Sequence, residues 1–166
     1  MDNKAVIQKL KQEAKGKTHA QQEEVIQKFL VFRLGPKKFA LPAEEVREIS
    51  LGDSIFFVPF VPPYIRGFIN RHGEPYTVID IQVLFENEQL KASTFLILNT
   101  EEDQACFLIS DVQEILKLSS EYVHTITSVD ESNRFFLKTI QYNDEEIFVL
   151  NTTSILERLE NDVRSE

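Results

Sequence analysis

Few residues in this sequence have the types and spacing that catalysis or metal binding requires. The three histidines, His19, His72 and His124, stand at no metal-ligand spacing from a cysteine or a carboxylate. The single cysteine, Cys106, lies inside the apolar run QACFLIS, where a buried structural thiol is far more common than a nucleophile. We therefore expect no metal site and no cysteine-based chemistry.

The motifs that hold a nucleophile or a phosphate group are also missing from the sequence. It contains no G-x-S-x-G or Walker motif, and its five glycines are spaced too far apart for G-x-G-x-x-G. Asp80 and Asn151 each follow a strand-like run and precede an apolar helical turn, a position typical of helix N-caps rather than of catalytic carboxylates. We expect no catalytic activity and no bound cofactor.

The composition is that of a globular protein, with 42% hydrophobic residues and 13 phenylalanines, which favour half-buried strands. The net charge of −9, without a cluster of Lys and Arg, argues against binding to nucleic acid. No stretch approaches the roughly 20 apolar residues of a membrane span, and a lone cysteine cannot form an internal disulfide. We expect a cytoplasmic protein that neither binds nucleic acid nor inserts into a membrane.

Residues 1–27 differ from the rest of the chain. An apolar helical face can form between residues 3 and 14, with lysines around it, from Ala5, Val6, Ile7 and Leu10. A polar linker follows. We predict a tail that is either a short helix or flexible, and a frayed tail is the favoured interpretation.

From Phe29 onward, short β-like runs follow one another, and residues 154–163 have a helical pattern. The runs are FLVFRL (29–34), KFALP (38–42), VREISL (46–51), FFVPF (56–60), RGFIN (66–70), EPYTVID (74–80), TFLILN (94–99), QACFLIS (104–110), VQEILKL (112–118), RFFLKTIQ (134–141) and EEIFVLN (145–151). Strands this short and this closely spaced predict an all-β fold of small barrels or a sandwich, not βαβ units.

An internal repeat divides this part of the chain. At a shift of 66 residues, FLVF (29–32) aligns with FLIL (95–98), and VREI (46–49) aligns with VQEI (112–115). At a shift of 71 residues, VID (78–80) aligns with VLN (149–151). The repeat predicts two similar β subdomains of roughly 65 residues, about 28–90 and 91–153, packed together and followed by a helix and tail over 154–166.

Four parts of the chain carry motifs in a characteristic order. They are FLVFRLGPKKFALPAEEVREI (29–49), YIRGFINRHG (64–73) with VIDI (78–81), LISDVQEILKL (108–118) and EEIFVLNTTSIL (145–156). Together they resemble the CheW-like domain over residues 28–160, whose usual motifs include G-x-I-N-L-R-G and P-V-I-D-L. The resemblance implies two packed SH3-like five-stranded β-barrels with a short C-terminal helix. It also implies a non-catalytic protein that links the cytoplasmic tips of chemoreceptors to the histidine kinase CheA.

The resemblance further implies a set of receptor-binding residues. In the family, positions matching Val46, Ile49 and Ile115 border the receptor-binding cleft, and Val112 completes the duplicated pair. Glu48 matches a position linked to partner binding. From the residues alone, ordinary core is the favoured interpretation of the four apolar side chains. With the resemblance, the cleft is favoured for Val46 and Ile115.

Several residues depart from the family pattern. Arg71-His72 stands where the family has Leu-Arg, and that Arg is normally implicated in receptor contact. His72 is then either a solvated residue of a two-residue hairpin turn or a replacement for the usual Arg, with Arg71 supplying the charge. In a regular strand the two side chains would point to opposite faces. The other departures are Thr77 for Pro, Ser110 and Asn151 for Asp, and Lys138-Thr139 for Gly.

The partners that the resemblance implies are the chemoreceptor cytoplasmic tip and the regulatory domain of CheA, which has the same fold. The alternative is a CheW-like regulatory module or paralogous adaptor that serves another receptor or kinase.

Overall fold

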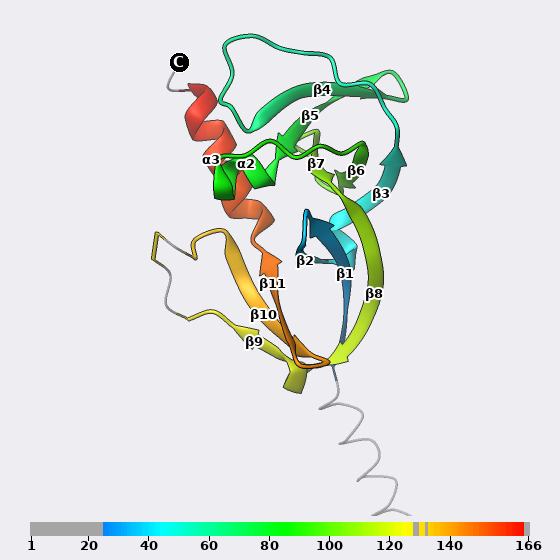
Figure 1. Cartoon of the computed structure of the whole chain (residues 1–166), viewed down its shortest axis with the longest axis vertical. Coiled ribbons are helices and arrows are strands. Elements are labelled where there is room, and N and C mark those ends of the chain that lie inside the picture. Colours follow the sequence, from blue (N-terminus) through cyan, green and yellow to red (C-terminus); the bar gives the residue numbers. More distant parts are fainter. Residues whose placement is uncertain (1–24, 128–129, 132, 165–166) are drawn as a thin grey trace, which may run out of the picture.

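The structure is a computed structural model that describes residues 25–127, 130–131 and 133–164. Two β-sheets lie one above the other in Figure 1, with a helix beside them. The helix predicted within residues 3–14 and the last two residues of the tail lie outside the described residues.

The two sheets contain six and five strands. The six-stranded sheet has the order β8 (Asp111–Ser119), β1 (Ile26–Leu34), β2 (Lys37–Pro42), β11 (Glu145–Leu150), β10 (Phe136–Tyr142) and β9 (Val123–Thr125). The five-stranded sheet has the order β3 (Val46–Leu51), β6 (Thr94–Leu98), β7 (Ala105–Ile109), β5 (Glu74–Asp80) and β4 (Ile65–Arg71). The predicted all-β fold is confirmed.

Each sheet takes strands from both halves of the repeat. β1 and β2 precede residue 90 but join β8, β10 and β11, whereas β6 and β7 follow it but join β3, β4 and β5. The first two strands of each repeat have therefore exchanged places, and the orders β8-β1-β2-β11-β10 and β3-β6-β7-β5-β4 are equivalent. A repeat reveals which segments are similar but not which segments pair, so sheet membership differs from the sequential division at residue 90.

The helices begin at the predicted N-caps. Asp80 Oδ1 accepts a hydrogen bond from the backbone N–H of Val83 (3.2 Å) at the start of α2 (Ile81–Glu86). Asn151 Oδ1 accepts one from Ser154 (3.2 Å) at the start of α3 (Thr152–Arg164), which confirms the C-terminal helix. Two short 3-10 turns, η1 (Ala43–Glu45) and η2 (Ser120–Tyr122), each precede a strand. None of the helices in the described ranges is long and apolar enough to cross a bilayer.

The larger core cluster packs the two sheets together. It contains fully buried side chains of the six-stranded sheet, such as Phe32 and Leu41, together with Phe95 and Phe107 of the five-stranded sheet. A smaller cluster lies within the six-stranded sheet. Because the larger cluster takes residues from both sheets, the two sheets share one main core.

The segment FFVPF (56–60) was expected to be strand-like, but it forms only an isolated bridge between Phe56 and Phe68 of β4. The three nearby prolines explain the difference, because proline has no N–H to extend a ladder. The two phenylalanines exchange backbone hydrogen bonds of 2.7 and 3.0 Å, and their rings stack at 5.3 Å. Beside them, Gly67 has φ +131°, and a Cβ there would collide with the Phe56 carbonyl oxygen.

We expect Gly67→Ala to lower the free energy of unfolding by about 2 kcal/mol or more, because the new methyl group must displace backbone. Gly52→Ala is the matched control: Gly52 also has positive φ (+75°), but nothing lies within 4 Å of its Cβ position. The control should therefore lose only about 1 kcal/mol, from the left-handed backbone alone. Urea unfolding of both variants measures the difference, and equal losses would contradict the packing of the loop on Gly67.

A partly buried hydrogen bond joins the start of α3 to η1. The Thr152 hydroxyl donates a hydrogen bond to Glu45 Oε2 (2.9 Å). Burial raises the pKa of the Glu45 carboxyl above its ordinary value, and the hydrogen bond from Thr152 offsets part of that rise. The folded protein therefore holds a proton on Glu45 more tightly than the unfolded chain does.

We expect Glu45→Gln to raise the free energy of unfolding at pH 7 by no more than about 1 kcal/mol, because the site is partly solvated. The carboxylate destabilises the parent above its folded-state pKa, and this effect disappears as the pH falls below the unfolded-state pKa. Gln keeps an oxygen that accepts from Thr152. Urea unfolding of parent and variant should show a gap at pH 7 that closes near about pH 3.5. A gap that widens on acidification would refute the assignment.

Candidate protein-binding site

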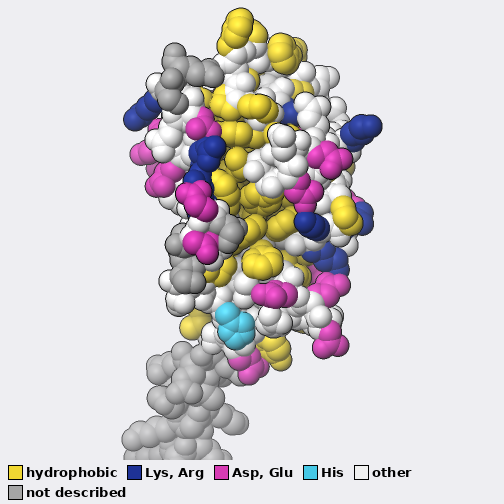
Figure 2. All heavy atoms as spheres, turned by 60° about the vertical axis from the view of Figure 1, so that its left-hand side comes forward, with side chains coloured by type: hydrophobic (Ala, Val, Ile, Leu, Met, Phe, Trp, Pro, Cys, Tyr) yellow, Lys and Arg dark blue, Asp and Glu magenta, His cyan; other side chains and the backbone are white. Residues whose placement is uncertain are grey.

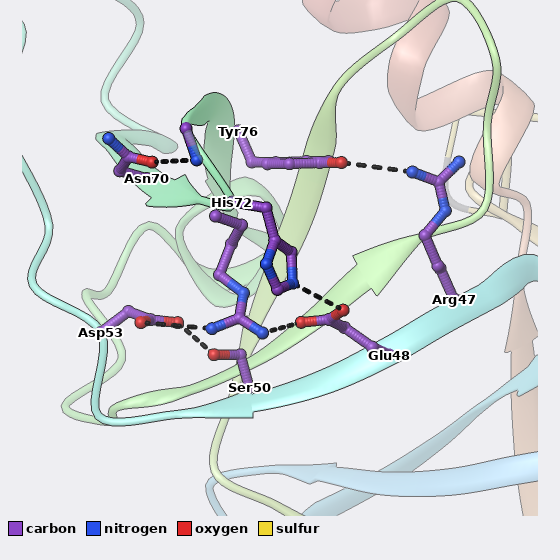
Figure 3. A network of polar contacts seen from close by, with 9 residues as sticks. Arg47, Glu48, Ser50, Asp53, Asn70, His72 and Tyr76 are labelled. Atoms are coloured by element: carbon purple, nitrogen blue, oxygen red, sulfur yellow. Dashed lines mark hydrogen bonds and ion pairs between the residues drawn. The ribbon is translucent and has the colours of Figure 1, made fainter.

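A polar cluster closes the five-stranded sheet between its two edge strands, β3 and β4 (Figure 3). Arg71, the last residue of β4, pairs with Glu48 of β3, and its Nη1 lies 3.7 Å from Asp53 Oδ1 just beyond β3. All three side chains are between one fifth and one third exposed. Ion pairs in such partly buried places hold side chains in fixed positions more effectively than fully exposed pairs do.

His72 lies in the turn that follows Arg71 and approaches the same carboxylate. Its Nε2 is 3.9 Å from Glu48 Oε2, and its side chain is 80% exposed. In a regular strand Arg71 and His72 would point to opposite faces, but β4 ends at Arg71 and His72 has a left-handed φ of 53°. The predicted two-residue turn is confirmed: Arg71 pairs with Glu74, and φ is positive at both His72 and Gly73.

Neighbouring hydrogen bonds support this cluster (Figure 3). The Ser50 hydroxyl donates to Asp53, and Arg47 Nη1 donates to the Tyr76 hydroxyl (3.2 Å), which joins β3 to β5. Asn70 Oδ1 accepts a hydrogen bond from the Gly73 N–H (3.0 Å) inside the turn. Arg71 and Glu48 are thus presented on a rigid frame.

The four predicted apolar residues fall into two kinds. Val46 and Val112 are half-buried against the core cluster, whereas Ile49 and Ile115 are 45% and 58% exposed. The division is the same in both repeats. It places one exposed isoleucine on each of β3 and β8, which are edge strands of their sheets and are drawn on the right of Figure 1. Ordinary core is therefore an incorrect description of the isoleucines.

A β-bulge accompanies the V-x-E-I segment in both repeats. The register shifts between Val46 and Glu48 in β3, and it shifts at the partners of Val112 and Glu114 in β8. Bulges at sheet edges re-aim the side chains that follow them. Leu51, which is 75% exposed and two positions after Ile49, extends the apolar surface on β3.

The sequence reasoning missed Leu51 and Asp53 at this site and, in the loop after β3, Phe57 and Phe60. Leu51 could have been found from its i, i+2 spacing to Ile49, which places both on one face of a strand. No sequence pattern marks Asp53, because it meets Arg71 only where the two edge strands, β3 and β4, come together. Phe57 and Phe60, in the loop after β3, are 80% and 92% exposed. They were missed because segment 56–60 was expected to be a strand.

The described residues offer no arrangement for catalysis at this site. Cys106 is completely buried, and burial raises the pKa of its thiol well above the usual range. No three His, Cys, Asp or Glu side chains within residues 25–127, 130–131 and 133–164 are placed to hold a metal ion. The arrangement can bind protein surfaces through apolar side chains next to fixed charges.

Comparison with known proteins places the chain in a family. The model of the CheW-like domain matches residues 28–160. The chemotaxis protein CheW of Helicobacter pylori is 23% identical over 159 residues, which cover 93% of this chain and 96% of that protein. CheW of Klebsiella aerogenes is 26% identical over 104 residues, which cover 61% and 63% of the two chains.

A solved structure shows the same fold. The scaffolding protein TtCheW of Thermoanaerobacter tengcongensis matches with a TM-score of 0.70 at 22% identity, over 76% of this chain and 90% of that one. The match over residues 28–160 spans both of the strand-exchanged sheets, and the chain belongs to the CheW-like domain family.

Proposed function

We propose that this protein is a non-catalytic adaptor of chemotaxis that links the cytoplasmic tip of a chemoreceptor to the regulatory domain of the histidine kinase CheA. The observation that carries the proposal is its membership of the CheW-like family, whose proteins couple receptors to this kinase. Likeness to a CheW over 96% of that protein's length supports it. The protein would act in the cytoplasm and reach receptor arrays through its protein partners.

The receptor-binding surface of this proposal combines the two edge strands. Ile49 and Ile115 are the exposed apolar anchors, and Val46 and Val112 support them from the core side. A few such anchors supply most of the binding energy of a typical interface. The nearby pair of Arg71 and Glu48, with His72 beside it, adds fixed charges that select the partner.

An adaptor needs a second surface for its second partner. Phe57 and Phe60 form a separate group of strongly exposed apolar side chains in the loop between β3 and β4. Side chains of this kind in clusters mark protein interaction sites. Gly67 anchors the loop against β4, so its phenylalanines are presented from a fixed base.

The second candidate function is a paralogous adaptor that serves another receptor or kinase. His72 favours it, because it stands where the family has an arginine and offers no planar fork for a carboxylate. The identities of 23% and 26% to the CheW proteins are consistent with such divergence.

We expect Ile115→Asp to weaken binding to a receptor-tip fragment by at least about 1–2 kcal/mol, since a charge would enter an apolar interface. Ile115 is 58% exposed, so the fold should tolerate the change. Val163→Asp is the control, because Val163 is similarly exposed (50%) but lies on α3. Calorimetry measures both affinities. If a folded Ile115→Asp protein binds the receptor tip as tightly as the parent does, β8 is not part of the receptor-binding surface.

We expect His72→Arg to leave binding to the protein's own receptor tip unchanged or weaker. Arg71 already pairs with Glu48, and a second guanidinium would compete for the same carboxylate. His72→Lys is the control, because it adds the charge without the fork. Titration of all three proteins against the receptor tip decides the matter: clear tightening by Arg alone would show that the site suits a standard receptor.

A further inference from the structure

A cavity of about 540 Å³ lies between α2 and the six-stranded sheet, away from the residues proposed to bind the receptor. Five phenylalanines and a leucine line it: Phe39, Phe85, Phe135, Phe136, Phe148 and Leu84. Their rings are tilted or stacked against one another, with Phe136 centred 5.0 Å from Phe148 and 5.2 Å from Phe85. The face turned forward in Figure 2 shows a band of hydrophobic side chains between charged ones.

The charged side chains that line this cavity leave its interior apolar. Lys37 pairs with Glu86 (2.5 Å), and Glu131 approaches Arg134 (3.6 Å). In each pair at least one of the two side chains is more than half exposed, and the contact is made by one oxygen of the carboxylate. A ligand for this cavity must therefore bring apolar side chains for the rings, and it gains from cations placed near the two glutamates.

Residues 1–17 of the same chain have this chemistry. Val6, Ile7 and Leu10 share one helical face at i, i+3 and i+4 spacing. The segment contains five lysines against Asp2 and Glu13, a net charge of +3. The whole chain has a net charge of −9, so the remaining residues together carry −12. A basic, one-sided apolar segment is thus joined to an acidic protein with an open apolar cavity.

The segment is also long enough to reach the cavity. Val25 and Ile26, where the described chain begins, line a neighbouring cavity together with Lys138 of β10. Phe136, which lines the phenylalanine cavity, is two residues from Lys138, about 7 Å along the strand. The ten residues between Ala14 and Val25 can span roughly 33 Å.

We propose that residues 3–14 dock into the phenylalanine cavity of their own chain. Val6, Ile7 and Leu10 then cover the rings of Phe85, Phe135 and Phe136. The surrounding lysines lie beside Glu86 and Glu131. Tethering favours this occupant over a free peptide, because a short linker keeps the local concentration of the segment high.

Paramagnetic broadening in the full-length protein tests the proposal. A nitroxide is attached at Gln8→Cys, on the polar face of the segment, and the native Cys106 stays unlabelled because it is completely buried. We expect selective broadening of the amide signals of Phe85, Phe135 and Phe136. Adding Leu10→Asp should lower the docked fraction by about tenfold or more. Gln12→Asp, on the polar face, should leave the broadening intact.

Three results would overturn the proposal. Broadening confined to the cavity beside Val25 and Phe29 would place the segment elsewhere. Broadening seen only between molecules, in a mixture of nitroxide-labelled and isotope-labelled protein, would make a second copy the occupant. Uniform weak broadening that Leu10→Asp does not change would show that the segment does not dock.

Discussion

The carboxylate of Asp80 is the group on which the arrangement of the five-stranded sheet depends. It is fully buried, and it accepts hydrogen bonds from the N–H groups of Val83 (3.2 Å) and Leu90 (2.9 Å) and from Arg66 Nη1 (2.9 Å). Arg66 also donates to the Leu90 carbonyl (3.1 Å). One side chain thus ties β5 to α2, to β4 and to the connection that leads to β6. Leaving such a buried group without one partner costs about 1–3 kcal/mol. In the second repeat the neutral Asn151 caps α3 with one N–H bond.

Strand exchange makes the two sheets one cooperative unit and at the same time creates the candidate site. β1 and β2 are built into the sheet of the second repeat, so the outer strands β3 and β8 are left as equivalent edges. Each edge carries the same bulged V-x-E-I segment with the valine packed inward and the isoleucine exposed. Edge strands are liabilities unless they are protected or used. The exposed isoleucines at equivalent positions of β3 and β8 are consistent with edges that are used for binding.

Local sequence patterns predicted those features of the structure that depend on a few adjacent residues. Asp80 and Asn151 were identifiable as caps, and His72-Gly73 as a turn, because a cap or a tight turn depends on two to four adjacent residues. Two features depend on distant partners and escaped prediction. FFVPF has the composition of a strand, but its prolines leave it outside the ladder. Arg71 meets Glu48 only when the sheet closes. Ile49 and Val46 differ in exposure because residues three apart in a strand point to opposite faces, a local rule that the sequence analysis did not apply to this segment.

The exchanged strands also set the order in which the chain can complete its sheets as it leaves the ribosome. The hairpin of β1 and β2 is made first, yet β2 finds its other neighbour only when Phe148 reaches Phe39, 109 residues later. At a synthesis rate of about 5–20 residues per second, the hairpin waits roughly 5–20 s for β11, and of its partners in the sheet only β8 can pair with it in the meantime. The five-stranded sheet needs no residue beyond Ile109 and can assemble sooner. The nascent chain therefore has a period in which its earliest apolar strands depend on chaperones, or on speed, to avoid pairing with a neighbour.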